Sequence, residues 1–359
     1  MNPRALRALV CIMTKKKKWI WPLISLLLAV LSVSAVLSQL GEMPLRQFWE
    51  TVREADVRWL SAAAVCGALF LILEGEAIRC ILRGAGHPAL FAGGLLYSAA
   101  DIYFSAITPS ATGGQPASAL YMHRDGIPAG VVTAALLVNL VMYTLSIVLL
   151  GLAAAILDFP LIYGFSAVSK ALILIGFAVQ LGLTVLFFLL LGKGDRVFGT
   201  LRNLARLLHR WKLLHNPESA LARLDKAERD HDLCAELIRG KPRMLIGAFL
   251  MNFFQRVSRI AVPVFTYMAL GGSVRQAPRV FASQCFVTIG YNCVPVPGGM
   301  GVADYLMVDG FSELMAFDDA IHLEVLSRSI SFYFCVAVSG VIVLAGTLIQ
   351  RSRRRKQAL

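Results

Sequence analysis

The residues best suited to chemistry are polar side chains inside strongly apolar segments, and the clearest set lies between residues 244 and 270. Asn252, Arg256 and Arg259 follow i, i+4, i+7 spacing, so an α-helix would place all three on one face. An arginine at the middle of a bilayer costs at least about 2.5–3.5 kcal/mol, so a partner must satisfy it. A guanidinium pairs well with phosphate oxygens and keeps its charge at any relevant pH. The pattern therefore favours an anion-binding site.

An internal ion pair is the alternative role for these two arginines, and the two roles can alternate during transport. Glu324 and Arg328 are spaced i, i+4 and can pair with each other on a helix. Asn139, Tyr143 and Ser146 also share a helical face, where hydrogen bonding between helices is the expected role. The acidic residues that could pair with Arg256 or Arg259 are Glu74, Glu76, Asp101, Asp304 and Glu324.

Two loops rich in proline and glycine, at 108–116 and 294–301, form the second notable feature. Proline and glycine interrupt helices, and glycine lets the backbone approach a ligand closely. Backbone N–H groups in such loops, or at the helix ends beside them, can bind phosphate oxygens. The loop residues predicted to contact an anion are Gly113, Gly114, Gln115, Gly298 and Gly299.

The composition indicates a membrane protein. Hydrophobic residues make up 57% of the 359-residue chain and charged residues only 16%, whereas a soluble domain carries about 25% charged residues. The net charge of +13 would suggest a nucleic-acid partner in a soluble protein. Here the basic residues gather in blocks between apolar runs, which is typical of membrane orientation signals and contacts with anionic lipid. We therefore expect no direct nucleic-acid partner.

Motifs of soluble enzymes are missing from the sequence. It contains no HExxH, P-loop, GxSxG or Rossmann fingerprint, and its six histidines lack the spacing of metal ligands. The seven cysteines include no CxxC pair, and most lie in apolar segments, so we interpret them as reduced core residues. We accordingly predict no catalytic residue, no metal and no cofactor.

Six apolar segments are long enough to cross a bilayer as helices. Two shorter ones, roughly 89–107 and 276–294, each run into a Pro/Gly loop. Irregular backbone at membrane depth survives only where protein or a water-filled cavity surrounds it, so these two are predicted to be re-entrant. The predicted class is an all-α polytopic protein in a single membrane domain, with spans at roughly 19–40, 57–79, 127–157, 161–192, 244–270 and 319–349.

A weak internal repeat relates the two loop regions. Ala119-Leu120-Tyr121 before Asp125-Gly126 recurs as Ala303-Asp304-Tyr305 before Asp309-Gly310, and the paired glycines lie at nearly the same offset. Paired broken helices are typical of transporters built from inverted repeats. We predict repeat units at about 57–157 and 244–349, separated by a basic connector at about 193–243; chance similarity between apolar stretches is the alternative.

Charge predicts that both termini lie on the cytoplasmic side. Lys15 to Lys18 precede the first span, and five basic residues follow the last one between 351 and 356. The connector carries twelve further Lys and Arg residues and is expected to be helical, either on the membrane surface or as a solvated link. Three full spans separate the two loops, so the first broken helix is predicted to enter from the cytoplasm and the second from outside.

The two loops also carry a family resemblance. The run from Thr108 to Pro116, with Tyr121 and Met122 beyond it, resembles the first signature of a flippase-like family that includes the transmembrane region of bacterial lysylphosphatidylglycerol synthase. The run from Pro295 to Gly301 resembles the second signature, Pro-x-Pro-Gly-Gly-x-Gly. The resemblance covers most of the chain, from about the second span to the last.

The resemblance implies a protein of the bacterial inner membrane that binds and translocates a lipid. In the full-length synthases a soluble C-terminal domain transfers lysine to phosphatidylglycerol, and we expect this chain to lack it, since it ends soon after its last span. Phosphatidylglycerol lysyltransferase activity is therefore not expected of this chain alone. A membrane component of such a synthase and a lipid-binding protein that moves no lipid are the alternatives.

The predicted partner is a membrane phospholipid, either anionic or aminoacylated, and a homo-oligomer is compatible with the sequence. The acidic residues could pair with the arginines when no substrate is bound, or meet a cationic headgroup. The predicted substrate-binding residues are Arg79, Asp101, Gly113, Gly114, Gln115, Asn252, Arg256, Arg259, Gly298, Gly299, Asp304, Glu324 and Arg328.

Overall fold

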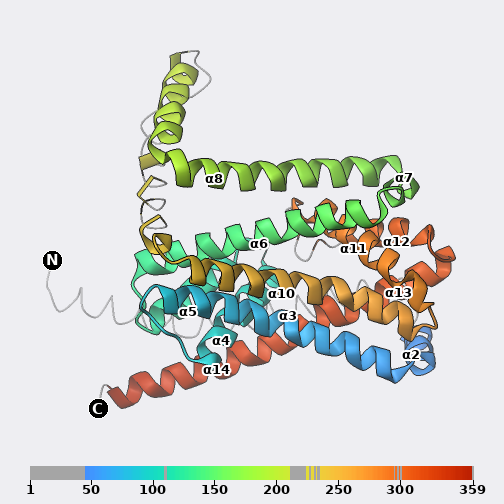
Figure 1. The fold of residues 1–359 in the computed structure, drawn as a ribbon. Helices are drawn as coiled ribbons and strands as arrows, with labels where there is room; N and C mark the ends of the chain where they lie inside the picture. Colours follow the sequence, from blue (N-terminus) through green and yellow to red (C-terminus); the bar gives the residue numbers. More distant parts are fainter. Residues whose placement is uncertain are drawn as a thin grey trace, which may run out of the picture. The chain divides into compact units, whose positions relative to one another are not determined.

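The fold is all-helical wherever the chain can be described. The computed structural model describes residues 45–108, 111–210, 235–294 and 301–357, with isolated positions at 224–225, 228–229, 232, 296 and 299. Every regular element in these residues is a helix and none is a strand, which confirms the predicted all-α class (Figure 1). The predicted first span, 19–40, lies outside the described residues.

Most consecutive helices are joined by short connections, whereas α8 and α10 are separated by residues 211–241, most of which lie outside the described residues. Their bounds are α2 Leu45–Glu54, α3 Val57–Gly84, α4 Phe91–Ile107, α5 Gly114–Arg124, α6 Ala129–Asp158, α7 Leu161–Gly164, α8 Ala167–Arg210, α10 Pro242–Ala269, η3 Val274–Gln276, α11 Ala277–Asn292, α12 Val302–Ser312, α13 Phe317–Arg328, the π-helical segment η5 Ser329–Phe334, and α14 Cys335–Gln357.

Four segments of the described chain are long and apolar enough to cross a membrane. They match four of the predicted spans, which confirms a polytopic membrane protein. Helix α3 has 28 residues and is also long enough, but it carries Glu74, Glu76 and Arg79 and is not among the four. The four are Ala129–Asp158, Ala167–Leu189, Pro242–Ala269 and Phe317–Gln350.

The two short apolar segments form helices that stop at the Pro/Gly loops. Helix α4 has 17 residues and α11 has 16, so each is about 25 Å long. That is less than the roughly 30 Å thickness of a bilayer's hydrocarbon core. Each loop is followed by an 11-residue helix, α5 or α12. A helix, a break and a second short helix is the arrangement that a broken helix requires, while its depth in the membrane stays a prediction.

Helix lengths recur in the two halves of the chain. Helices α3, α4, α5 and α6 have 28, 17, 11 and 30 residues. Helices α10, α11 and α12 have 28, 16 and 11 residues, and the last apolar segment, Phe317–Gln350, has 34. The order of long, short, short and long is therefore the same in both predicted repeat units.

The two halves interleave. The long helices α3 and α10 pack along each other, which is the most extensive helix contact in the described chain. Helix α4 packs against α14 from the second half, whereas α11 packs against α6 from the first half. Each short helix is therefore held partly by the last long helix of the other half.

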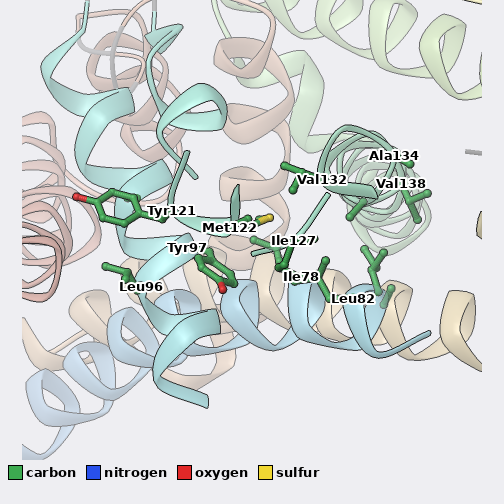
Figure 2. Close-up of a cluster of buried hydrophobic side chains, with 14 of the residues drawn as sticks. Ile78, Leu82, Leu96, Tyr97, Tyr121, Met122, Ile127, Val132, Ala134 and Val138 are labelled. Atoms are coloured by element: carbon green, nitrogen blue, oxygen red, sulfur yellow. The ribbon is translucent and has the colours of Figure 1, made fainter. Parts of the chain in front are cut away.

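Two buried apolar cores hold this arrangement. Figure 2 shows part of the first, where Ile78 and Leu82 of α3 meet Tyr97 of α4, Met122 of α5 and Val132 of α6. The second core joins the C-terminal part of α10 to α7, α8, α11, α12 and α13. Both α6 and α10 contribute to both cores, so each of these long helices runs from one core to the other.

The connector starts as a continuation of α8, which is helical to Arg210. This confirms the predicted helix for that part of 193–243, and most of the remainder lies outside the described residues. The Arg202 guanidinium pairs with Asp225 at 3.0 Å and also with Glu228. These carboxylates neutralise part of the connector's positive charge and raise the pKa of Arg202.

Replacing Gly75 with valine is expected to destabilise the protein. A Cβ atom at Gly75 would lie 2.8 Å from the carbonyl carbon and oxygen of Gly94, and backbone atoms cannot easily move away. Overpacking of this kind costs about 1–3 kcal/mol. The measurement is the fraction of monodisperse protein that remains after heating in detergent. The matched control is Gly182→Val, because nothing lies within 4 Å of a Cβ atom there; equal losses in both variants would contradict the close contact between α3 and α4.

Candidate functional site

A buried polar layer separates the two apolar cores along α10. Met244 belongs to the first core and Ile260 to the second. Between them lie Asn252, Gln255 and Arg256, with side chains no more than 4% exposed. Arg256 falls at the middle of the helix, as the sequence predicts for an arginine near the midplane of a span.

A chain of hydrogen bonds links Arg256 to Glu74 on α3. The Arg256 Nε–H donates to Gln255 Oε1 at 2.8 Å, and Gln255 Nε2 donates to Glu74 Oε2 at 2.8 Å. Glu74 is buried, and Gln255 is almost wholly enclosed. The amide therefore separates the cation from the carboxylate and makes the contact indirect.

Both arginines lie against aromatic rings. The Arg256 guanidinium carbon is 4.3 Å from the centroid of the Tyr143 ring and 5.2 Å from that of Phe70. The Arg259 guanidinium carbon is 5.0 Å from the same Phe70 ring. Ring faces attract cations. The two guanidinium groups therefore share one aromatic platform.

Neither arginine forms a direct salt bridge within the described residues, where no carboxylate oxygen lies within 4.0 Å of either guanidinium. Arg256 is buried and Arg259 is half-buried. Glu74 is near enough to both for electrostatic attraction without direct contact. The predicted internal ion pair is thus present only as an electrostatic interaction with Glu74, without direct contact. Both guanidinium groups therefore keep N–H donors with which they can bind another anion.

Asp101 on α4 belongs to the same site. Its carboxyl group interacts with the carboxyl group of Glu74, with Ser105 and with Arg256. Gly114 lies directly against it, because a Cβ atom there would be 2.1 Å from Asp101 Oδ1. The first Pro/Gly loop therefore places the start of α5 beside a carboxylate. The prediction that Gly114 presents its backbone to an anion receives no support from this contact.

Polar contacts between helices border the arginines. Asn252 Nδ2 donates to Asn139 Oδ1 at 2.9 Å, which connects α10 to α6. Tyr143 Oη donates to Asn292 Oδ1 at the end of α11. The predicted interhelical role of Asn139 and Tyr143 is thus confirmed. It is wrong for Ser146, whose hydroxyl donates to the carbonyl of Met142 on its own helix because that acceptor is one turn away.

A second charged cluster joins α12 to α13. Arg328 Nε lies 2.7 Å from Asp304 Oδ1 and 3.7 Å from Glu324 Oε1, so the predicted pairing of Glu324 with Arg328 is confirmed. Asp304 Oδ2 also accepts a hydrogen bond from Gly301 N at 2.7 Å, which caps α12. Asp304 and Glu324 are therefore occupied by Arg328 and do not pair with Arg256 or Arg259.

Tyr291 lies between the two clusters. It interacts electrostatically with Arg256 and Arg259 of the polar layer and with Arg328 of the second cluster. Gly299, with φ of +69°, packs beneath its ring, where an added Cβ atom would be 2.8 Å from Tyr291 Cδ2. Gly299, one of the few described residues of the second Pro/Gly loop, therefore packs against a tyrosine that interacts with the arginines of the polar layer.

Other predicted site residues lie elsewhere. Arg79 pairs with Glu76, donates from Nε to the Ala89 carbonyl at 3.1 Å and faces the Phe91 ring, so its contacts are with the start of α4. Gly113 N donates to Thr108 Oγ1 at 2.9 Å, which satisfies one of the loop's N–H groups internally.

For Gln115 and Gly298, a role in anion binding stays a prediction. Gln115 is exposed near the start of α5. Gly298 lies outside the described residues.

The structure adds three residues that the sequence analysis did not select: Phe70, Gln255 and Tyr291. Gln255 adjoins Arg256 in the sequence, so a polar side chain beside an intramembrane arginine was an available signal. Phe70 and Tyr291 gave no such signal, because aromatic residues are common in apolar helices.

In the described residues no group of three or more His, Cys, Asp or Glu side chains could hold a metal ion.

The fold and site define a polytopic helical membrane protein with two short broken-helix regions around a buried cationic layer. The chain belongs to the lysylphosphatidylglycerol synthase transmembrane-region family, whose profile matches residues 22–339. It is also similar to a UPF0104 membrane protein of Archaeoglobus fulgidus, at 22% identity over 303 residues that cover 80% of this chain and 86% of that protein. The family expected from the two Pro/Gly loops is thereby confirmed.

Replacing Arg328 with glutamine is expected to lower the free energy of unfolding by about 3 kcal/mol, because two adjacent carboxylates would lose their buried counter-charge. Arg279 is the matched control. Its Nε lies 2.7 Å from Asp158, but its side chain is 45% exposed against 7% for Arg328. Arg279→Gln should cost no more than about 1 kcal/mol. Unfolding in detergent, followed by circular dichroism, measures both, and equal losses would contradict a structural role for the second cluster.

Proposed function

We propose that the protein is a lipid translocator whose site, formed by Arg256 and Arg259, binds the phosphate headgroup of an anionic or aminoacylated phospholipid. The acyl chains remain in the bilayer while the headgroup occupies the polar layer. The observation that carries this proposal is the pair of guanidinium groups on the Phe70 ring, with no carboxylate within 4.0 Å in the described chain.

The chemistry of the site favours a phosphate ligand. Two guanidinium groups offer several N–H donors, and charge-assisted bonds to phosphate oxygens are among the stronger hydrogen bonds in proteins. Arg259 is partly buried, and its guanidinium group forms no hydrogen bond within the described residues, so its N–H donors are not used by the protein there. The carboxylates of Glu74 and Asp101 lie on the other side of Gln255 and could meet the amino group of an aminoacylated headgroup.

Movement of the lipid, beyond its binding, is supported by the recurring helix order. Two units with long, short, short and long helices pack around the polar layer. Inverted units of this kind let a substrate site open to one leaflet and then to the other. We propose that the units are inverted, that the protein lies in the cell membrane, and that both termini are cytoplasmic, as the basic flanks indicate.

The inverted arrangement predicts opposite accessibility for the two broken helices. In a variant without the seven native cysteines, Gln115→Cys should react with a membrane-impermeant maleimide added to the cytoplasmic side. Val302→Cys should react only from the opposite side, because the second unit is reversed. Labelling of right-side-out and inside-out vesicles measures this, and reaction of both cysteines from one side would contradict inversion.

Loss of either arginine is expected to reduce lipid translocation. In proteoliposomes that contain fluorescent phosphatidylglycerol, Arg256→Ala and Arg259→Ala should each slow translocation at least about tenfold, because a hydrogen bond to a charged group contributes about 1.5–3 kcal/mol. Dithionite quenching of the outer leaflet measures the rate. Arg279→Ala, which removes an exposed guanidinium, should leave the rate unchanged.

Three outcomes of this assay count against the proposal. Unchanged translocation in both arginine variants would exclude the site. Tight lipid binding by the wild type without movement would favour a lipid-binding protein that is not a transporter. Formation of lysylphosphatidylglycerol by the purified chain from charged tRNA would favour an enzyme.

A further inference from the structure

A Tyr-x3-Asp-Gly motif recurs in the two halves of the chain and makes the same kind of contact in both. It lies at 121–126, at the end of α5, and at 305–310, within α12. In each copy the tyrosine hydroxyl and the aspartate carboxylate form hydrogen bonds with residues outside their own repeat unit. The proposed headgroup site makes no use of either copy, so the shared contact calls for a separate explanation.

The first copy holds the end of α5 against α14, and we call this contact the α5 clasp. Tyr121 Oη and Thr347 Oγ1 share a hydrogen bond of 2.7 Å. Asp125, the residue after α5, accepts hydrogen bonds from Gln350 Nε2 at 2.7 Å and from Tyr97 Oη of α4 at 2.7 Å. Asp125 is exposed, so water can replace these bonds when the helices separate.

The second copy holds α12 against the residue before α8, and we call this contact the α12 clasp. Asp309 Oδ2 accepts a hydrogen bond from Ser166 N at 2.9 Å. Tyr305 Oη and Ser166 Oγ share a hydrogen bond of 2.9 Å. Tyr305 is 45% exposed, so this clasp also borders solvent or headgroups and can open without exposing a dry core.

The two clasps lie at opposite ends of α6. Asp125 lies just before α6 begins at Ala129, and Ser166 follows the end of α6 at Asp158, after the single turn of α7. Helix α6 has 30 residues and is therefore about 45 Å long. That is the thickness of a bilayer with its headgroup regions, so one clasp lies near each membrane face.

Each short helix lies between a clasp and the polar layer. Gly114 at the start of α5 lies against Asp101, because a Cβ atom there would be 2.1 Å from Asp101 Oδ1. Gly299, shortly before α12, packs against Tyr291, which interacts with the arginines of the layer. Both short helices have 11 residues. A movement that opens a clasp therefore also moves backbone that lies against the polar layer or its tyrosine.

Both clasps are closed in this structure, and the polar layer is closed with them. The side chains of Asn252, Gln255 and Arg256 are at most 4% exposed. A lipid headgroup therefore cannot reach Arg256 from either face unless part of the structure moves.

One apolar segment, Phe317–Gln350, connects the two clasps. Its first helix, α13, is tied to α12 by the 2.7 Å contact of Arg328 with Asp304, and its last helix, α14, carries Thr347 and Gln350 of the α5 clasp. Between them lies the π-helical segment η5. Such segments bend a helix and are frequent at functional sites. A bend at η5 lets α14 move away from α5 while α13 stays on α12.

From these contacts we infer that the two clasps are gates that open one at a time, the α5 clasp at one membrane face and the α12 clasp at the other. Each open gate admits a headgroup to the polar layer from one leaflet. The inference rests on the proposed function and deepens it by naming the contacts that control access to the site. With cytoplasmic termini, the α5 clasp faces the cytoplasm.

Loss of one clasp should open the polar layer from one face only. In the full-length chain without its seven native cysteines, Asn252→Cys places a reporter thiol in the layer, where the native side chain is 1% exposed. A membrane-impermeant maleimide is added to right-side-out and to inside-out vesicles. Asp125→Ala should raise the labelling rate at least about tenfold from one face, because it removes hydrogen bonds to a charged group. Asp309→Ala should do so from the opposite face.

The matched control is Asp318→Ala, which removes an exposed carboxylate at the start of α13 that belongs to neither clasp. It should leave labelling from both faces unchanged. Tyr121→Phe and Tyr305→Phe remove a hydroxyl from the same position of the two motif copies and keep the ring. Each should raise labelling from the face of its own clasp, by less than the aspartate variant, and they decide the question if an aspartate variant fails to fold.

The outcomes separate this inference from the proposed function. Unchanged labelling in both clasp variants, or an increase from the same face in both, would overturn the gates. The headgroup site would survive that result if lipid translocation still required Arg256 and Arg259. If each clasp variant is labelled from its own face but the wild type moves no lipid, the gates are supported and the proposed function is contradicted.

Discussion

Charge balance inside an apolar bundle is the constraint on which the rest of the structure depends. Arg256 and Arg259 cannot lose their charge, and lipid offers them no solvent. Three groups stabilise these charges in the protein. The Phe70 ring lies against both guanidinium groups, and the Gln255 amide accepts a hydrogen bond from Arg256 and donates one to the Glu74 carboxylate. The apolar cores on either side keep these weak compensations effective, because electrostatic attraction falls when water enters.

The two charged clusters differ in how their arginines meet carboxylates. Arg328 contacts two carboxylates directly and joins neighbouring helices close to each other in the sequence. Arg256 reaches Glu74 only through Gln255 and draws together helices from opposite halves of the chain. A direct ion pair uses the N–H donors of the arginine and holds its side chain in one position. An arginine that reaches a carboxylate only through an amide keeps N–H donors with which it can bind a ligand. This difference, rather than family membership, makes Arg256 and Arg259 the stronger candidates for ligand binding.

Local spacing predicted much of the fold and part of the site. Helical periodicity placed Asn252, Arg256 and Arg259 on one face correctly, since that needs only the geometry of one helix. Arg79 was also assigned to the site as a charged residue in an apolar segment, but the turn before α4 returns the chain to it and supplies the Ala89 carbonyl. The Glu74–Gln255 contact joins residues 181 positions apart, so only the packing of α3 on α10 could reveal it.

The interleaving of the two halves has a consequence for how the chain is made. The first core includes Met244 and Val343, and α4 rests against α14, so the first half cannot complete its packing until the ribosome has synthesised nearly the whole chain. Until then the face of α4 that packs on α14 lacks its final neighbour. Contacts so distant in sequence slow folding. A nonsense codon before α14 would therefore leave two incomplete halves rather than one working repeat.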